Sequence, residues 1–163
     1  MERISVLFVC LGNICRSPTA EAVFRKRAVQ AGLDVHIESA GTSAWHEGEK
    51  PDARSQETGV KRGYSFNGQE SRKVHKNDFV LFDHIIAMDR KNLDGLKDIC
   101  PPALQHKVQL FMDFAPHASV REVPDPYYGG ADGFDNVLDL IEQASDGLIE
   151  RLNTQSLPKG TAQ

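Results

Sequence analysis

An almost unbroken apolar run lies near the start of the chain. Residues 4–9 read Ile-Ser-Val-Leu-Phe-Val, a pattern typical of a strand that is buried on both faces of a parallel sheet. After a short segment, residues 10–16, Ser17 and Pro18 supply a hydroxyl N-cap and a proline suited to the first helical position. We therefore expect a helix over residues 18–31, ended by Gly32. The chain begins with a strand, a tight loop and a helix.

Strand-like and helix-like segments go on alternating after this first unit. Val35 and Ile37 predict a second strand, followed by a loop of small residues at positions 39–42. Further strands are expected at 84–88 and 108–112, further helices at 52–62, 91–99 and 134–152, and a frayed tail from 154. The alternation predicts a doubly wound α/β fold, with a parallel four-stranded sheet flanked by helices on both faces. We expect a single domain over residues 1–155 and a flexible C-terminal tail over 156–163.

Composition and charge exclude several classes of protein. The net charge of −4 and a pI near 5.8 argue against a nucleic-acid binder, which needs a basic face. No apolar run reaches the ~18 residues of a membrane span and no signal-peptide pattern is present, so we expect a cytoplasmic protein. The three cysteines are an odd number for a disulfide framework, and the six histidines show no metal-ligand spacing. We expect reduced thiols and no metal, and neither a nucleic acid nor a membrane as partner.

The tight loop carries the clearest chemistry. Cys10 stands at the carboxyl end of the first strand and Arg16 just before the helix, where open α/β sheets bind ligands. Loop amides and the helix N-terminus can form a nest for an anion, and the same positive field favours a nucleophilic thiolate over a thiol. Arg16 can pair with two phosphate oxygens, and Ser17 can donate its hydroxyl to the sulfur. The sequence predicts a phosphate-binding loop after the first strand, with Cys10 as nucleophile.

A Cys-x5-Arg pattern is weak support by itself. A buried, inert cysteine beside an arginine in an ordinary salt bridge is the common outcome for such a pair. Gly12, Asn13 and the Ser-Pro cap favour the catalytic interpretation in this chain.

Asp125 is the candidate proton donor for the leaving group. It lies in a long loop, residues 115–133, within the segment Val-Pro-Asp-Pro-Tyr-Tyr-Gly-Gly. By local sequence alone a turn aspartate is the better interpretation, and it is the cysteine motif that favours catalysis. Once a phosphocysteine forms, the same carboxylate can act as base toward the hydrolytic water.

Two separated segments carry a family resemblance. They read Val-Leu-Phe-Val-Cys-Leu-Gly-Asn-Ile-Cys-Arg-Ser-Pro-Thr-Ala-Glu-Ala-Val-Phe near the N-terminus and Asp-Pro-Tyr-Tyr-Gly-Gly near the C-terminus. Residues 39–42 before Trp45, Arg72, and Ala-Met-Asp at 87–89 add further landmarks between them. Together these segments resemble the low-molecular-weight protein tyrosine phosphatases over about the whole chain. The resemblance implies that family's fold and activity, with no metal or cofactor.

The resemblance also implies a role for each residue of the site. Cys10 would be the nucleophile, Arg16 the phosphate clamp, and Asp125 the general acid and then base. Phosphate binding and loop support would fall to Leu11, Gly12, Asn13, Ile14, Cys15, Ser17 and Ser39. Trp45, Tyr127 and Tyr128 would wall the pocket, although core packing is the ordinary interpretation of such aromatics. Gln69 departs from the pattern, because mammalian members carry a loop-supporting histidine there.

Cys15 has two interpretations, since it lies inside the phosphate loop. Ordinarily it would be a small apolar packing residue, whereas the resemblance suggests a resolving thiol that traps oxidised Cys10 as a reversible disulfide. Cys100 is expected to be structural.

The expected substrates are tyrosine-phosphorylated proteins, because a phenyl ester is long enough to reach a recessed sulfur. A cognate tyrosine kinase is a further expected partner, and we expect the protein to be a monomer.

Two rival functions stay open. A thioredoxin-coupled arsenate reductase uses a similar loop, but it relays electrons through a further pair of cysteines, and this chain has only Cys100 downstream. A catalytically silent phosphopeptide-binding module needs the nest and Arg16, but it gains little from Cys10 or Asp125.

Overall fold

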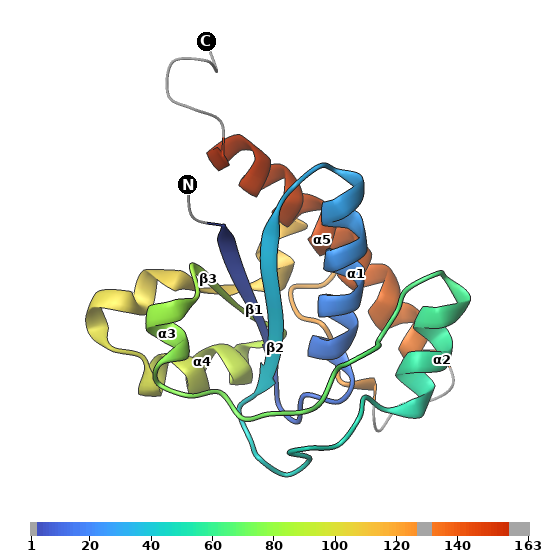
Figure 1. Ribbon diagram of the computed structural model, residues 1–163, viewed down its shortest axis with the longest axis horizontal. Coiled ribbons are helices and arrows are strands. Elements are labelled where there is room, and N and C mark those ends of the chain that lie inside the picture. Colours follow the sequence, from blue (N-terminus) through green and yellow to red (C-terminus); the bar gives the residue numbers. More distant parts are fainter. Residues whose placement is uncertain (1–2, 127–131, 157–163) are drawn as a thin grey trace.

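Four parallel strands form the centre of the molecule (Figure 1). The structure is a computed structural model and describes residues 3–126 and 132–156. The strands are β1 (Ile4–Cys10), β2 (Val35–Gly41), β3 (His84–Ala87) and β4 (Val108–Leu110), in the order β2-β1-β3-β4. Cys10 pairs with Gly41 and Val9 with Ala87, so the carboxyl ends of β1, β2 and β3 meet at one edge. The predicted fold class is confirmed.

Helices cover both faces of this sheet (Figure 1). On one face lie α1 (Arg16–Gln30) and α5 (Gly133–Ser156), with α2 (Ala53–Lys61) against α5; on the other lie α3 (Asp78–Leu81) and α4 (Arg90–Ile99). Two 3-10 helices, η1 (Pro102–Lys107) and η2 (Phe111–Phe114), flank β4. Within the described ranges, no helix combines the length and apolarity that crossing a membrane requires.

The side chains of β1 alternate between two hydrophobic cores. Val6 and Phe8 pack in the larger core, together with residues of α1 and α5, while Leu7 and Val9 pack in the core beneath α4. All four are fully buried. Burial on both faces is the physical reason for the continuous apolar run in the sequence.

The first helix starts earlier than its cap residues predict. It begins at Arg16, with Cys15 at the N-cap position and no side-chain cap bond. Ser17 does not cap the helix, because its hydroxyl contacts the Cys10 sulfur and accepts a hydrogen bond from Asn13. Pro18 still lies in the first turn, where its missing N–H breaks no intrahelical bond. The prediction of Ser17 as N-cap is wrong for a functional reason.

Three other boundaries differ from the sequence prediction by two residues or more. β2 continues through Gly41, so of the expected small-residue loop only Thr42 lies outside the strand. β4 ends at Leu110, and the two residues after it belong to η2. α5 continues to Ser156, so a tail starting at 154 is wrong, while residues 157–163 lie outside the described residues. The short helix α3 was not predicted, because four residues are too few to show a helical period.

Candidate active site

Most carbonyl groups of the loop over residues 10–16 are held from outside the loop. The carbonyls of Cys10 and Leu11 accept from Thr42 N at 2.9 Å and Ser43 N at 3.0 Å. The Ile14 carbonyl accepts from Asp52 N at 2.8 Å, and the Cys15 carbonyl accepts from Thr19 Oγ1 at 2.7 Å. In a planar trans peptide the following N–H points away from the carbonyl. The loop amides are therefore turned inward, as an anion nest requires.

Asn13 fixes the bend of this loop. Its φ of 56° lies in the left-handed region, which asparagine tolerates better than most residues. The side-chain Nδ2 donates to Ser17 Oγ at 2.8 Å and to Ser39 Oγ at 3.0 Å, and Oδ1 accepts from Arg72 N at 3.0 Å. Ser39 Oγ in turn donates a hydrogen bond to Glu21 Oε1 at 2.8 Å. The structure places Asn13, Ser17 and Ser39 together, as the resemblance implies.

The Cys10 sulfur lies at the centre of these contacts. It is 3.0 Å from Ser17 Oγ, and Ser17 N lies 3.4 Å from it. Because Ser17 Oγ already accepts from Asn13, its own hydroxyl proton is available for the sulfur or for the Ala40 carbonyl, 3.4 Å away. The shorter contact is with the sulfur. A hydroxyl that donates to sulfur stabilises the thiolate over the thiol.

Arg16 is buried beside the sulfur and held by two groups. Its Nη1 lies 2.6 Å from Asp89 Oδ2 and donates to the Val123 carbonyl at 3.0 Å. Burial by itself would lower the pKa of the guanidinium, but the Cys10 sulfur and the Asp89 carboxylate outweigh it and raise that pKa. The Arg16 side chain, predicted to clamp phosphate, is thus positively charged and held in place by Asp89 and the Val123 carbonyl.

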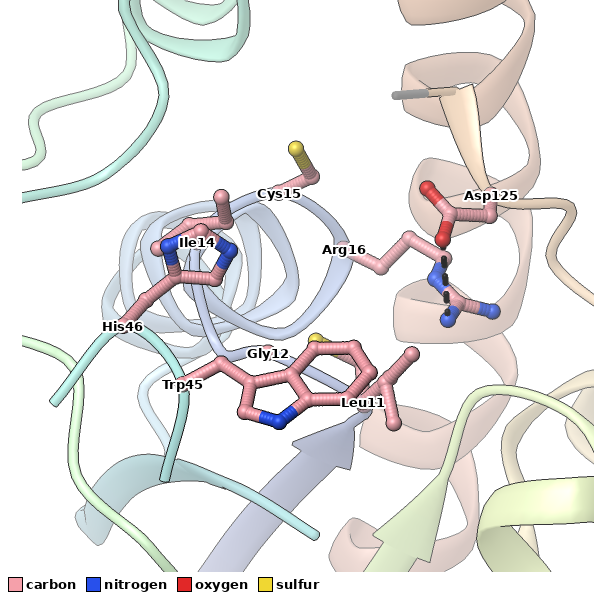
Figure 2. Close-up of a pocket in the computed structure, with 9 residues that line it drawn as sticks. Leu11, Gly12, Ile14, Cys15, Arg16, Trp45, His46 and Asp125 are labelled. Carbon is pink, nitrogen blue, oxygen red and sulfur yellow. Dashed lines mark ion pairs between the residues drawn. The ribbon is translucent and has the colours of Figure 1, made fainter. Parts of the chain in front are cut away.

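Asp125 reaches the same site from the long loop. Its Oδ2 lies 3.9 Å from Arg16 Nη2, and its side chain is 35% exposed (Figure 2). An open cleft lies above the loop. Its lining residues are Cys10, Leu11, Gly12, Ile14, Cys15, Arg16, Trp45, His46 and Asp125. The three predicted catalytic residues therefore line one cleft.

The predicted aromatic wall is described only in part. Trp45 is 75% exposed and lies at the cleft with Leu11 (Figure 2). Core packing of Trp45, the ordinary interpretation, is thereby ruled out. Tyr127 and Tyr128 lie outside the described residues.

Cys15 is held as a protonated thiol. It is buried with Ile14 and Phe134, and Figure 2 shows its sulfur pointing away from Trp45 and Leu11. Burial, reinforced by the charge of Asp52, raises the pKa of Cys15 to about 12, against a weaker lowering by its bond to Ser55. Cys100 is buried in the second core, as expected of a structural cysteine. Among the described residues, no three metal-ligating side chains come together.

Gln69 supports the first turn of α1. Its Nε2 donates to the Pro18 carbonyl at 3.1 Å, while its Oε1 is buried without a hydrogen-bond partner among the described residues. The amide thus supports the helix that follows the loop through one of its two polar atoms.

Sequence reasoning gave no role to three residues of the site. Asp89 pairs with Arg16 and also caps α4 through Asn92 N at 2.8 Å. His46 lies against Gly12, where an added Cβ would come within 2.9 Å of the His46 Cδ2 atom. At Gly41 an added Cβ would come within 2.8 Å of the Leu11 carbonyl oxygen. Only Asp89 had a usable signal, since an aspartate directly after a buried strand lies at the ligand-binding edge.

Comparisons with known proteins agree with this geometry. Residues 5–157 match the family model described as low molecular weight phosphotyrosine protein phosphatase. A protein of that name from Schizosaccharomyces pombe is 46% identical over 145 residues, which cover 86% of this chain and 92% of the relative. The crystal structure of an Entamoeba histolytica protein tyrosine phosphatase, with Hepes in its active site, has a TM-score of 0.91 and 44% identity and covers 94% of this chain and 99% of its own. A Drosophila arginine phosphatase has a TM-score of 0.84 and 33% identity, covering 90% of this chain and 96% of its own.

Proposed function

We propose a mechanism from one premise: this chain belongs to the low molecular weight phosphotyrosine protein phosphatases and is a cysteine-dependent protein-tyrosine phosphatase. The proposed reaction is a two-step hydrolysis of a phosphotyrosine monoester through a phosphocysteine on Cys10. The observation that carries it is the Cys10 sulfur, bonded to Ser17 in a loop whose amides turn inward, beside Arg16 and Asp125.

In the first step the Cys10 thiolate attacks phosphorus. A P–S bond forms and the bond from phosphorus to the phenolic oxygen breaks, while protonated Asp125 gives its proton to that oxygen. The loop amides and Arg16 hold the phosphate oxygens as their charge redistributes. Asp89 supports this step by fixing Nη1, which leaves the other edge of the guanidinium to pair with the phosphate.

In the second step water displaces the sulfur. Asp125, now a carboxylate, takes a proton from the water, whose oxygen forms a new bond to phosphorus. The P–S bond breaks and its electron pair returns to Cys10 as a thiolate, which Ser17 stabilises through its hydroxyl. The products are inorganic phosphate and the regenerated enzyme.

The aromatic mouth supports phosphotyrosine as the preferred ester. Trp45 offers an exposed ring at the cleft, while Cys10 is only 3% exposed. A phenyl ester spans that depth and stacks on an aromatic ring, whereas the ester oxygen of phosphoserine lies too close to its backbone. Tyr127 and Tyr128 are proposed to complete the wall. A monomeric enzyme, a cytoplasmic location and a cognate kinase remain predictions from the sequence.

The test compares turnover of three matched peptides that carry phosphotyrosine, phosphoserine or phosphoarginine. We expect turnover of the phosphotyrosine peptide to dominate. Comparable rates on phosphoserine would contradict the selectivity, and faster phosphoarginine turnover would point to the activity of the Drosophila relative. If the wild type binds a phosphopeptide but does not hydrolyse it, the result would instead support a catalytically silent phosphopeptide-binding module.

Two variants test the roles of the catalytic residues. Cys10→Ser should bind phosphate but show no turnover. Asp125→Asn should lower kcat by about 10²- to 10⁴-fold on phosphotyrosine, but much less on p-nitrophenyl phosphate, whose leaving group hardly needs a proton. Asp113→Asn, which changes an exposed carboxylate outside the cleft, is the control. Equal losses on both substrates would exclude Asp125 as the acid.

Cys15 is proposed to protect the nucleophile from over-oxidation. Hydrogen peroxide would convert the Cys10 thiolate to a sulfenic acid with release of hydroxide. The Cys15 thiol would then attack the sulfenic sulfur, forming the S–S bond and releasing the sulfenic hydroxyl, with the thiol proton, as water. The two residues lie in one loop, five positions apart. Because the pKa of Cys15 is about 12, closure of the disulfide should accelerate as pH rises. Mass spectrometry should find this crosslink in peroxide-treated protein; a peroxide-inactivated sample without it would exclude the role.

A further inference from the structure

The Gly12 carbonyl is anchored differently from the other bonded carbonyls of the phosphate loop. Those of Cys10, Leu11, Ile14 and Cys15 each accept from a backbone N–H. The Gly12 carbonyl accepts from a side chain, Ser71 Oγ, at 2.9 Å. Among the loop carbonyls with a hydrogen bond in the described residues, the Gly12 carbonyl is therefore the one that can lose its anchor through a single side-chain substitution.

Ser71 is itself firmly placed between two segments. It is 4% exposed, its N–H donates to the Glu49 carbonyl at 2.8 Å, and its carbonyl accepts from Gly48 N at 2.8 Å. The next residue, Arg72, donates its backbone N–H to Asn13 Oδ1 at 3.0 Å. Two consecutive residues thus hold Gly12 and Asn13, and the first of them also holds the segment that follows Trp45.

The direction of the Gly12 carbonyl decides the direction of the next amide. The Gly12 carbonyl and the Asn13 N–H belong to one planar peptide unit and point in opposite directions. With the oxygen held outward by Ser71, the N–H points into the loop. Gly12 has no side chain to limit rotation, and Asn13 has a φ of 56°, so this unit is the one most able to turn over. A hydroxyl bonded to the carbonyl also polarises the amide and makes it a stronger donor.

We propose that Ser71 is a positioning residue for phosphate binding. It touches neither substrate nor sulfur, and it acts by keeping the Asn13 N–H directed at the bound phosphate. The inference rests on the proposed function, because it assigns this amide to the phosphate that Cys10 attacks.

The experiment compares Ser71→Ala with Ser71→Thr, which keeps the hydroxyl. The readouts are the inhibition constant of inorganic phosphate and the separate values of kcat and KM on p-nitrophenyl phosphate. Ser71→Ala should raise the phosphate inhibition constant and KM about tenfold, as expected for a weakened bond to a charged group. Ser71→Thr should stay within about twofold of the wild type. A merely structural role would lower kcat through a smaller folded fraction, but it would leave the phosphate constant unchanged.

Two further variants keep the test decisive. Ser145→Ala removes a buried serine hydroxyl that lacks a hydrogen-bond partner among the described residues, and it should change neither constant. If Ser71→Ala does not fold, Ser71→Cys keeps the size with a weak S–H donor and should raise the phosphate constant several-fold. A phosphate constant within about twofold of the wild type in the folded variant would overturn the proposal. Phosphate binding can also be measured by thermal shift, which does not require turnover. A wild type without activity would therefore refute the proposed function, while the effect of Ser71 on phosphate binding could still be measured.

Discussion

The floor and the mouth of the cleft are built in opposite ways. At the floor, Cys10, Asn13, Arg16 and Ser17 are each at most 3% exposed, and their polar atoms bond to one another or to neighbouring segments. At the mouth, Trp45 is 75% exposed and the Asp125 side chain 35%. The phosphate site is therefore fixed by many mutual contacts, whereas the groups that meet the rest of the substrate are more exposed.

This difference separates two tasks of the enzyme. Binding of phosphate and stabilisation of its transition state need preorganised donors, which a buried and bonded loop supplies. Recognition of a leaving group on a large protein needs access. Substitutions of the arginine or the loop backbone at the floor should therefore lower kcat, as should loss of the acid Asp125. Truncation of Trp45 at the mouth should mainly change KM and the choice of ester.

Among the variants that compare Trp45 at the mouth with the floor, the largest expected effect comes from replacing the guanidinium at the floor. Arg16→Lys keeps the charge but loses the planar fork, so kcat should fall by about 10²- to 10³-fold. Steady-state kinetics on p-nitrophenyl phosphate would measure the loss. A Lys26→Arg variant, on the exposed part of α1, is the control and should leave kcat unchanged. A loss of less than about fivefold in Arg16→Lys would show that the floor needs only charge.

A backbone displacement at the floor should have the next largest effect. In Gly41→Ala the added Cβ would lie 2.8 Å from the Leu11 carbonyl oxygen and 3.2 Å from Asn13 Cβ. We expect kcat to fall about 100-fold, because a shift of the loop misplaces the reacting groups. Gly95→Ala in α4 is the matched control, since its Cβ would meet only Thr42 Cγ2 at 3.9 Å. Wild-type kcat in Gly41→Ala would mean that the loop adjusts without loss, contrary to a rigid floor.

Truncation at the mouth should have a smaller and different effect. Trp45→Ala should raise KM for a phosphotyrosine peptide about five- to tenfold through loss of aromatic contact. The inhibition constant of inorganic phosphate should not change, because phosphate occupies the floor alone. Measuring both constants in one variant tests whether the two regions are independent. An equal rise in both would show that they are coupled.

The smallest effect concerns the protonation of Cys15. Its pKa is raised by burial from 9.0 to about 12, so above pH 9 the unfolded chain loses a proton that the folded chain keeps. This stabilising contribution is complete below pH 9 and is lost as pH rises toward 12. Between about pH 8 and 9.5 the free energy of unfolding should fall by about 0.8 kcal/mol more in the wild type than in Cys15→Ala. Urea unfolding at the two pH values measures this difference, and parallel curves would contradict it.

The sequence predicted the parts of the site that neighbours along the chain determine. The apolar run of β1, the loop and the start of α1 are local features, and they place Cys10 and Arg16 correctly at the edge of the sheet. The cysteine motif called for a proton donor and led to Asp125, and the family resemblance added Ser39; both lie far from the loop in sequence. Neither route assigned a role to Asp89, His46 or Ser71, because their contacts exist only once β3 and the segments after β2 are folded against the loop. Ser17 was misread as a cap because its contacts with Cys10 and Asn13 in the loop outweigh the local capping preference.

The central place of β1 in the sheet has a further consequence. Its backbone is paired on both sides, and its side chains enter two separate cores. Fluctuations that open the segment around Trp45 leave those pairings intact, so the amides of Val9 and Cys10 should exchange with deuterium only when the whole domain unfolds. Access to the reactive sulfur is thereby limited to molecules small enough to enter from the rim.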